Sequence, residues 1–113
     1  MEIIVTELPD NVRCVRLSGR LDAQGVDRID TRFTAAVSSS GYPAVVDLSG
    51  VTFLASLGIR LLISNARAMK LKGAQLVLFG ATELVQNVLD QVALDQIIPI
   101  VGTEEQALER LRV

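Results

Sequence analysis

One hydroxyl side chain, Ser56, lies in an otherwise apolar stretch near the middle of the chain and is the first candidate for chemistry. The stretch reads FLASLGIRLL, residues 53–62, and its other members are apolar residues, a glycine and a single arginine. A helical pattern begins at Ser56, so its hydroxyl could cap the helix by accepting a hydrogen bond from a free amide of the first turn. The same amides and the positive end of the helix dipole would stabilise a phosphate on this hydroxyl. On general frequencies we expect Ser56 to be a helix cap; the residues allow the phosphorylated role but do not require it.

Phosphorylation of Ser56 would change the character of the residues around it. Phe53, Leu54, Ala55 and Leu57 form an apolar lip beside the hydroxyl. A phosphate would bring about two negative charges to this lip. Such a change could switch off a hydrophobic contact between the lip and a protein partner, a switch that the sequence allows but does not require.

Gly58 lies in the first turn of the same helical stretch. Glycine in a helix costs roughly 1 kcal/mol relative to alanine, so its presence indicates that another group approaches closely. Two interpretations remain open: tight packing against the strand predicted at residues 43–48, or access for the backbone of a partner.

Arg60 begins a polar row on this helix, because Ser64 and Arg67 follow it at helical spacing. Such a row is usually a solvated helix surface. It would become part of a partner surface if the neighbouring Ile59 and Ile63 were exposed. We include Arg60 among the candidate partner-binding residues.

A second candidate loop, SGRLDAQG, contains Gly19, Asp22 and Gly25. It is no phosphate-binding fingerprint, and Asp22 is most simply a cap or turn residue. In a parallel sheet, however, this loop and the loop before Ser56 both leave the carboxyl ends of their strands, where ligands and partners tend to dock. We expect the two loops to form one partner-binding site.

The sequence offers few candidate catalytic residues. The sequence has no histidine, which removes the commonest general base and the commonest metal ligand. The single cysteine, Cys14, cannot form a thiolate cluster, and its place in the alternating VRCVRL indicates a strand residue. We therefore expect no enzyme activity, no metal site and no cofactor.

Charge and hydropathy limit the kinds of partner. The chain has 11 Lys and Arg against 13 Asp and Glu, without long runs of either sign, so the basic patch of a nucleic-acid binder is missing. No apolar run approaches the roughly 20 residues that span a bilayer, and the first residues do not resemble a secretion signal. We expect a cytoplasmic protein without membrane insertion whose partners are other proteins or small ligands.

Periodicity and turn residues predict an α/β fold. We expect strands at residues 2–8, 12–19, 43–48, 74–80 and 97–101, with a loop at residues 49–55. We expect helices within residues 20–41 and at 56–72, 82–92 and 103–112. The order ββαβαβαβα requires a mixed, mostly parallel sheet with helices packed on it. Residues 1–113 are expected to form a single domain.

The chain resembles a STAS domain, the fold of bacterial anti-sigma factor antagonists. The resemblance covers nearly the whole chain through LSGRLDA, PAVVDLSGVTFLASLGIRLLISNARAMKLKGAQLVLFG and VLDQVALDQIIPI. The family stretch usually reads Asp-Leu-Ser-x-Val-x-Phe-x-Asp-Ser-Ser-Gly-Leu. The positions that agree are Gly19, Leu21, Asp22, Asp47, Ser49, Val51, Phe53, Ser56 and Gly58. Two depart: Ala55 replaces the aspartate, and Leu57 replaces the second hydroxyl.

The resemblance implies partner switching in transcription regulation. The unphosphorylated antagonist would bind an anti-sigma factor that is also a serine protein kinase, and so free the sigma factor. The kinase would phosphorylate Ser56 and end the contact, and a PP2C-type phosphatase would restore it. The domain would then be a phosphoprotein and a binding module without catalysis.

Two alternatives follow from the departures at Ala55 and Leu57. The chain could be a STAS scaffold or antagonist that is indifferent to phosphorylation. It could also be the small cytosolic STAS subunit of an ABC-type lipid transport complex, where a permanent subunit would not need the full acceptor motif.

Overall fold

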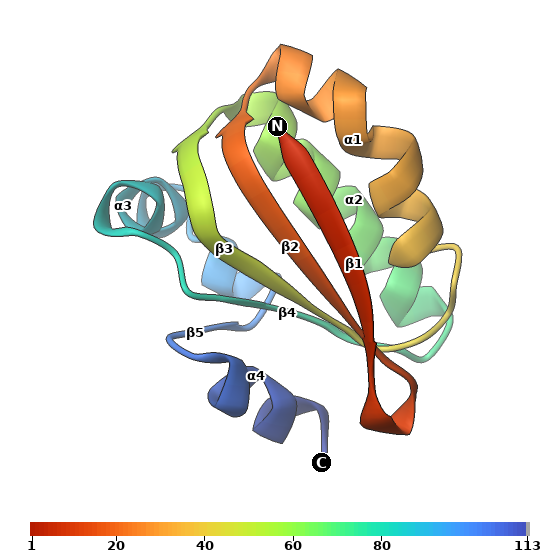
Figure 1. Cartoon of the computed structure of the whole chain (residues 1–113). Helices are drawn as coiled ribbons and strands as arrows, with labels where there is room; N and C mark the ends of the chain where they lie inside the picture. Colours follow the sequence, from red (N-terminus) through yellow and green to blue (C-terminus); the bar gives the residue numbers. More distant parts are fainter. Residues whose placement is uncertain (113) are drawn as a thin grey trace.

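The computed structural model describes residues 1–112, and a five-stranded mixed sheet organises them (Figure 1). Its strands lie side by side in sequence order; β1 is antiparallel to β2 and the other neighbouring pairs are parallel. The strands are β1 (Glu2–Leu8), β2 (Val12–Leu21), β3 (Ala44–Leu54), β4 (Leu76–Phe79) and β5 (Ile100–Val101). The predicted α/β class and element order are confirmed.

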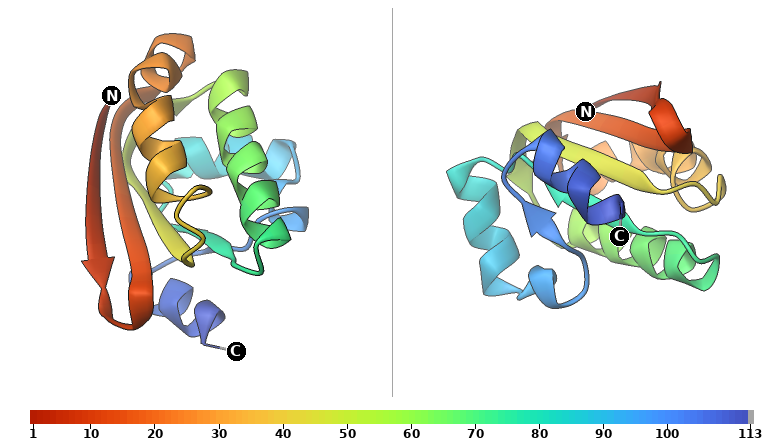
Figure 2. Two further views of the ribbon diagram at one scale, coloured as in Figure 1. Left: turned by 90° about the vertical axis from the view of Figure 1, so that its right-hand side faces the viewer. Right: turned by 90° about the horizontal axis from the view of Figure 1, so that it is seen from below.

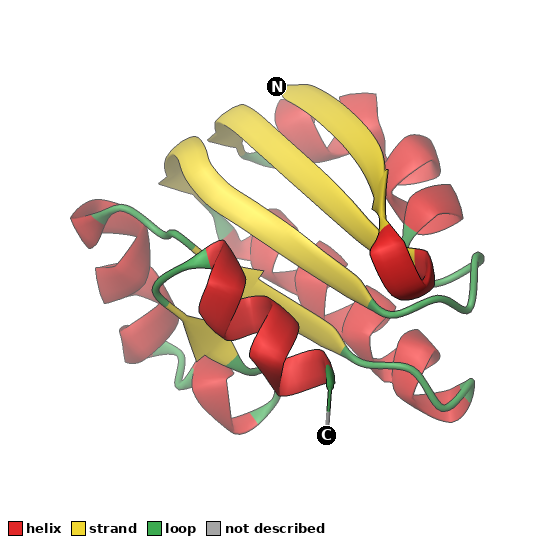
Figure 3. Ribbon diagram, turned by 60° about the horizontal axis from the view of Figure 1, so that its bottom comes forward, coloured by secondary structure: helices red, strands yellow, loops and turns green. Residues whose placement is uncertain are grey.

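Helices cover the two faces of the sheet unequally. Three pack on one face: α1 (Ala23–Ala36), α2 (Ser56–Leu71) and α3 (Glu83–Gln91). The fourth, α4 (Glu104–Leu111), lies on the other face, and Figure 3 shows it in front of the strands. Figure 2 shows α1 and α2 side by side against the sheet. Among the described helices, none combines the length and apolar character needed to cross a membrane.

Side chains that alternate along the strands point to opposite faces of the sheet and form two hydrophobic cores. Val46 and Leu48 of β3 enter the larger core under α1, α2 and α3, whereas Val45 enters the smaller core under α4. Cys14 lies in β2, which confirms the predicted strand, and its side chain is buried in the smaller core. Strands covered on both faces need apolar residues at consecutive positions, which explains the run AVV at the start of β3.

The loop predicted at residues 49–55 is wrong, because β3 continues to Leu54. Likewise, β2 continues to Leu21 instead of ending at Gly19. The added residues of β3 pair with β2: Gly50 opposes Ser18 and Leu54 opposes Leu21. The register shifts once just before Ser18 and once just after Gly19. A Ser-Gly pair usually indicates a turn. Here a neighbouring strand, which a local pattern cannot reveal, keeps this segment extended.

Helix ends largely follow their predicted signals. Thr82 caps α3 by accepting a hydrogen bond from the amide of Val85, and Thr103 forms a capping box with Gln106 at the start of α4. Gly73 follows α2 with φ of +79°, the left-handed conformation expected of a glycine that ends a helix. One predicted cap, Ser56, is wrong, as the geometry of the site shows.

Candidate functional site

The carboxyl ends of β2 and β3 bring the two candidate loops together. Leu21 and Leu54 are the last residues of these strands and lie opposite each other in the parallel pairing. The amide of Ala55 donates a hydrogen bond to the carbonyl of Leu21 at 3.1 Å. Helices α1 and α2 both begin within two residues of this point. Asp22 and Ser56 therefore lie at the same end of the sheet, as the crossover geometry predicted.

Ser56 is exposed and is the first residue of α2, one position beyond the cap. The cap residue is Ala55, and no side chain accepts a hydrogen bond there. The prediction that Ser56 caps the helix is therefore wrong, because only the residue before the first turn has the extended backbone that directs a side-chain oxygen back to the free amides. The amino end of α2 consequently keeps its partial positive charge without a side-chain acceptor.

Asp22 is the cap of α1, as expected. Its Oδ1 accepts a hydrogen bond from the amide of Gly25 at 2.9 Å, and its Oδ2 accepts one from Nε of Arg20 at 3.2 Å. The bond from the Gly25 amide, aided by Arg20, lowers the pKa of this carboxyl below its ordinary value. Asp22 is therefore charged at neutral pH and fixes the position of Arg20.

Arg20 is a site residue that the sequence did not single out. Its guanidinium carbon lies 4.3 Å from the centroid of the Phe53 ring, because Arg20 and Phe53 oppose each other in the pairing of β2 with β3. The arginine thus connects the carboxylate of Asp22 to the aromatic ring of the apolar lip. The only signal that could have found it is the register of two strands at their last residues.

The structure divides the predicted apolar lip into exposed and buried members. Phe53 is 38% exposed and Leu57 is 42% exposed, so both present apolar surface to solvent. Leu54 is only 5% exposed and packs in the larger core, and Ala55 is half-buried. Direct contact with a partner is therefore open to Phe53 and Leu57, whereas the prediction that Leu54 belongs to the exposed surface is wrong.

Gly58 is buried, and the group that approaches it belongs to the protein itself. A Cβ atom at this position would lie 2.7 Å from the Leu21 carbonyl oxygen and 2.9 Å from Cδ1 of Leu54. Both residues end their strands, so the approach comes from the ends of β2 and β3 and not from residues 43–48. Of the two interpretations, close internal packing holds, and Gly58 has no surface to offer a partner.

Arg60 is exposed one turn after Ser56 on α2. Ile59 and Ile63 are half-buried and pack against the larger core, so they do not extend the row of Arg60 into an apolar surface. Arg60 instead places a positive charge beside the exposed hydroxyl, since residues four apart are neighbours on a helix.

These residues form a small mixed surface that we call the Ser56 surface: Arg20, Asp22, Phe53, Ser56, Leu57 and Arg60. It presents an aromatic ring, an aliphatic side chain, a hydroxyl and three charged groups. Within residues 1–112, no three His, Cys, Asp or Glu side chains come together in a way that could hold a metal ion. The surface is suited to binding a protein, with one hydroxyl open to modification.

Comparison with protein families gives one match, which covers most of the chain. The family model described as STAS domain matches residues 4–107. Two curated relatives are named anti-sigma F factor antagonist. The protein from Paenibacillus polymyxa is 28% identical over 103 residues, covering 90% of this chain and 88% of its own. The protein from Lysinibacillus sphaericus is 26% identical over 99 residues, covering 87% and 84%.

Solved structures share the same fold over almost the full length. An anti-sigma factor antagonist from Mycobacterium paratuberculosis superposes with a TM-score of 0.83 at 26% identity, covering 99% of this chain and 94% of its own. SpoIIAA in its unphosphorylated form gives a TM-score of 0.78 at 20% identity, covering 98% and 96%. A proposed antagonist from Thermotoga maritima gives 0.89 at 20% identity, covering 98% and 95%.

Proposed function

Because this chain belongs to the STAS domain family, we propose that it is an anti-sigma factor antagonist, with residues 1–113 forming a single domain that acts in the cytoplasm. Curated relatives of similar length carry that name. The proposed partner is an anti-sigma factor that is also a serine protein kinase, and a PP2C-type phosphatase would reverse its action. The protein would act by binding alone, without catalysis.

The observation that carries the proposal is the composition of the Ser56 surface. Protein contacts favour aromatic side chains and arginine at their centre, and both occur here in the stacked pair of Phe53 and Arg20. Leu57 adds a second exposed apolar group. We propose that the partner covers Phe53 and Leu57 and places polar groups opposite Arg20 and Asp22.

We further propose that phosphorylation of Ser56 ends this contact. The hydroxyl is exposed, and its position at the uncapped start of α2 favours an added negative charge. Arg60, four residues later, would pair with the phosphate on the helix surface. A doubly charged group beside Phe53 and Leu57 would have to lose its hydration on partner binding, which opposes the contact.

The departures at Ala55 and Leu57 make Ser56 the acceptor hydroxyl at the start of α2. The same departures are also compatible with a second form of the proposal, in which phosphorylation does not affect partner binding. The two forms of the proposal differ in one respect: whether the partner kinase transfers phosphate to this serine.

Incubation with the cognate anti-sigma factor kinase and ATP, followed by peptide mass spectrometry, tests the switch. We expect phosphate on Ser56 and none on the Ser56→Ala variant. Ser39, an exposed serine after α1, provides a matched control as Ser39→Ala, which should accept phosphate as the parent does. Binding to the kinase without any phosphate transfer would favour the phosphorylation-indifferent antagonist. No binding to any anti-sigma factor of the same organism would refute the proposed function.

A further inference from the structure

A groove crosses the amino-terminal end of the sheet, at the opposite end from the Ser56 surface. Two adjoining hollows of about 360 and 490 Å³ form it, and both are lined by Pro43 and Leu111. One side of the groove is the hairpin between β1 and β2, the other is the turn after α2, and α4 lies along it. We call this the amino-terminal groove.

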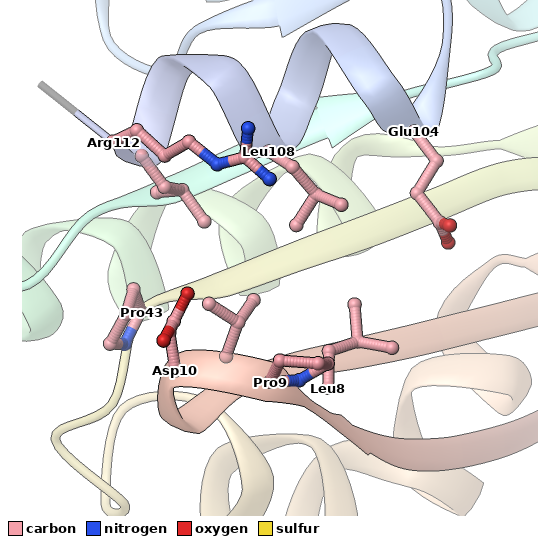
Figure 4. A pocket seen from close by; sticks show the side chains of 9 residues that line it. Leu8, Pro9, Asp10, Pro43, Glu104, Leu108 and Arg112 are labelled. Atoms are coloured by element: carbon pink, nitrogen blue, oxygen red, sulfur yellow. The ribbon is translucent and has the colours of Figure 1, made fainter.

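The half of the groove between the hairpin and α4 is apolar at its centre. Figure 4 shows the side chains of Leu8 and Leu108 pointing toward each other from the two sides, with Pro9 beside Leu8 and Pro43 farther along the hollow, near Asp10. Its carboxylates, Asp10 and Glu104, belong to the hairpin and to the start of α4. This half has the shape and lining that accept one or two large apolar side chains.

The half of the groove beside α2 is basic. Lys70 and Arg110 line it, and none of its lining residues is acidic. Lys72 adds a third cation at the rim: its Cδ atom lies 3.9 Å from where a Cβ of Gly41 would be, and its Nζ donates a hydrogen bond to the Ser38 carbonyl at 2.7 Å. In the part of the chain that the structure describes, the ion pairs within 4.0 Å involve other arginines and leave Lys70 and Arg110 out.

Arg112 adds a further cation to the half between the hairpin and α4. Its side chain runs back along α4 toward Leu108 in Figure 4. A protein of net charge −2 therefore gathers several of its 11 cations at one end. Segregated charge of this kind attracts a partner of the opposite sign and fixes the orientation in which it binds.

We propose that the amino-terminal groove binds an extended acidic segment of a partner protein. The segment would place one or two large apolar side chains between Leu8 and Leu108, and its neighbouring carboxylates would contact Lys70 and Arg110. The direction follows from the charges of the two halves. Asp10, Glu104 and Arg112 line the half between the hairpin and α4, whereas the charged residues that line the half beside α2 are cations, so carboxylates of the segment would favour the second half. This site is separate from the Ser56 surface, so one molecule could hold two partners at once.

Fluorescence anisotropy with synthetic peptides tests the inference on the full chain. The probes are labelled peptides with two leucines, a short Gly-Ser spacer and four glutamates, made in both orders. Matched peptides carry glutamine or lysine in place of glutamate. Binding is measured at about 0.02 M and about 0.5 M ionic strength, since added salt screens charge pairs at the surface. Amide chemical shifts from NMR locate the bound peptide.

We expect one glutamate peptide to bind at least about tenfold more tightly than its glutamine counterpart at low salt, and the difference to shrink at high salt. The double variant Lys70→Glu, Arg110→Glu should lose about tenfold or more of this affinity. A charge-matched control, Arg32→Glu with Arg67→Glu, changes exposed residues outside the groove and should bind as the parent does.

Several outcomes would overturn the inference: no saturable binding of either glutamate peptide, an equal loss in the control variant, or shift changes gathered around Phe53 and Ser56. A dimer in sedimentation velocity that the Lys70→Glu, Arg110→Glu variant dissociates would identify a second copy of the chain as the occupant instead. None of these results depends on whether Ser56 is phosphorylated.

Discussion

The guanidinium of Arg20 lies over the ring of Phe53, with 4.3 Å between its central carbon and the ring centroid. The same guanidinium donates a hydrogen bond to Asp22, which caps α1. The strand ends, the helix start and the exposed aromatic ring of the Ser56 surface are thus linked through one side chain. This arrangement leads to the first prediction.

Replacing Arg20 with methionine should weaken partner binding more than it weakens the fold. Arg20 lies on the surface that we propose the partner covers, and an exposed charged contact contributes up to about 1 kcal/mol, so we expect a loss of up to about fivefold in affinity. Titration calorimetry with the anti-sigma factor measures it. Arg20→Lys should recover part of the loss, because lysine keeps the charge but not the planar stacking. An Arg20→Met variant that binds the anti-sigma factor as tightly as the parent would contradict a role for Arg20 in the contact.

Replacing Asp22 with asparagine should make the stability of the protein less dependent on pH in the acid range. The pKa of Asp22 is lowered below its ordinary value of 3.8, first by the Gly25 amide and then by Arg20. A lowered pKa stabilises the fold above 3.8, and this contribution is lost as pH falls through the lower, folded-state pKa. The parent should therefore have the higher melting temperature at neutral pH, and the difference should vanish in strong acid. A difference in melting temperature that does not change with pH would show that the charge of Asp22 is not its source.

Replacing Gly58 with alanine should destabilise the protein despite the better helix propensity of alanine. Alanine in a helix gains roughly 1 kcal/mol over glycine. The new Cβ, however, would lie 2.7 Å from the Leu21 carbonyl oxygen, which is backbone and must shift. Overpacking of this kind costs about 1–3 kcal/mol, so we expect a net loss in urea unfolding. Ser64→Ala, at an exposed position of α2, is the control and should change stability by less than about 0.5 kcal/mol.

Cys14 should react slowly with alkylating reagents in the folded protein. Burial raises the pKa of its thiol above the ordinary value, and the carboxylate of Glu104 adds to the effect. We expect iodoacetamide at mildly alkaline pH to modify the folded chain about 100-fold more slowly than the chain in urea, because reaction requires opening of the smaller core. Mass spectrometry over time gives both rates. Equal rates would mean that α4 does not protect this strand.

The parts of the fold that could be predicted depend on local signals. Asp22 was recognisable as a cap because an aspartate followed by a helical pattern has a near neighbour to bond, the amide of Gly25. The extension of β3 to Leu54 was not recognisable, because β2 determines it from a distant part of the sequence. The Ser-Gly pair at residues 49–50 favours a turn only when no adjacent strand holds it extended.

The same distinction explains what was missed at the site. The sequence favours Ser56 as a cap because its hydroxyl stands at the start of a helical run, yet the backbone of Ala55 occupies the cap position. Arg20 contacts Phe53 only through the register of two parallel strands, and register depends on every residue pair along them. The sequence does not reveal that Leu54 and Gly58 are buried. Phe53 and Leu57 of the same stretch are exposed, and this difference depends on how α2 packs on the sheet.

The central claim, control of an anti-sigma factor through Ser56, is tested most directly by the affinity of two forms of the same protein. Titration calorimetry would compare unmodified protein with protein carrying phosphoserine at Ser56, and phosphoserine at Ser39 would serve as the control. We predict tight binding of the unmodified form and of the Ser39 control, and a loss of about 100-fold, or roughly 2.7 kcal/mol, with phosphate at Ser56. Equal affinity of all three forms would contradict the account.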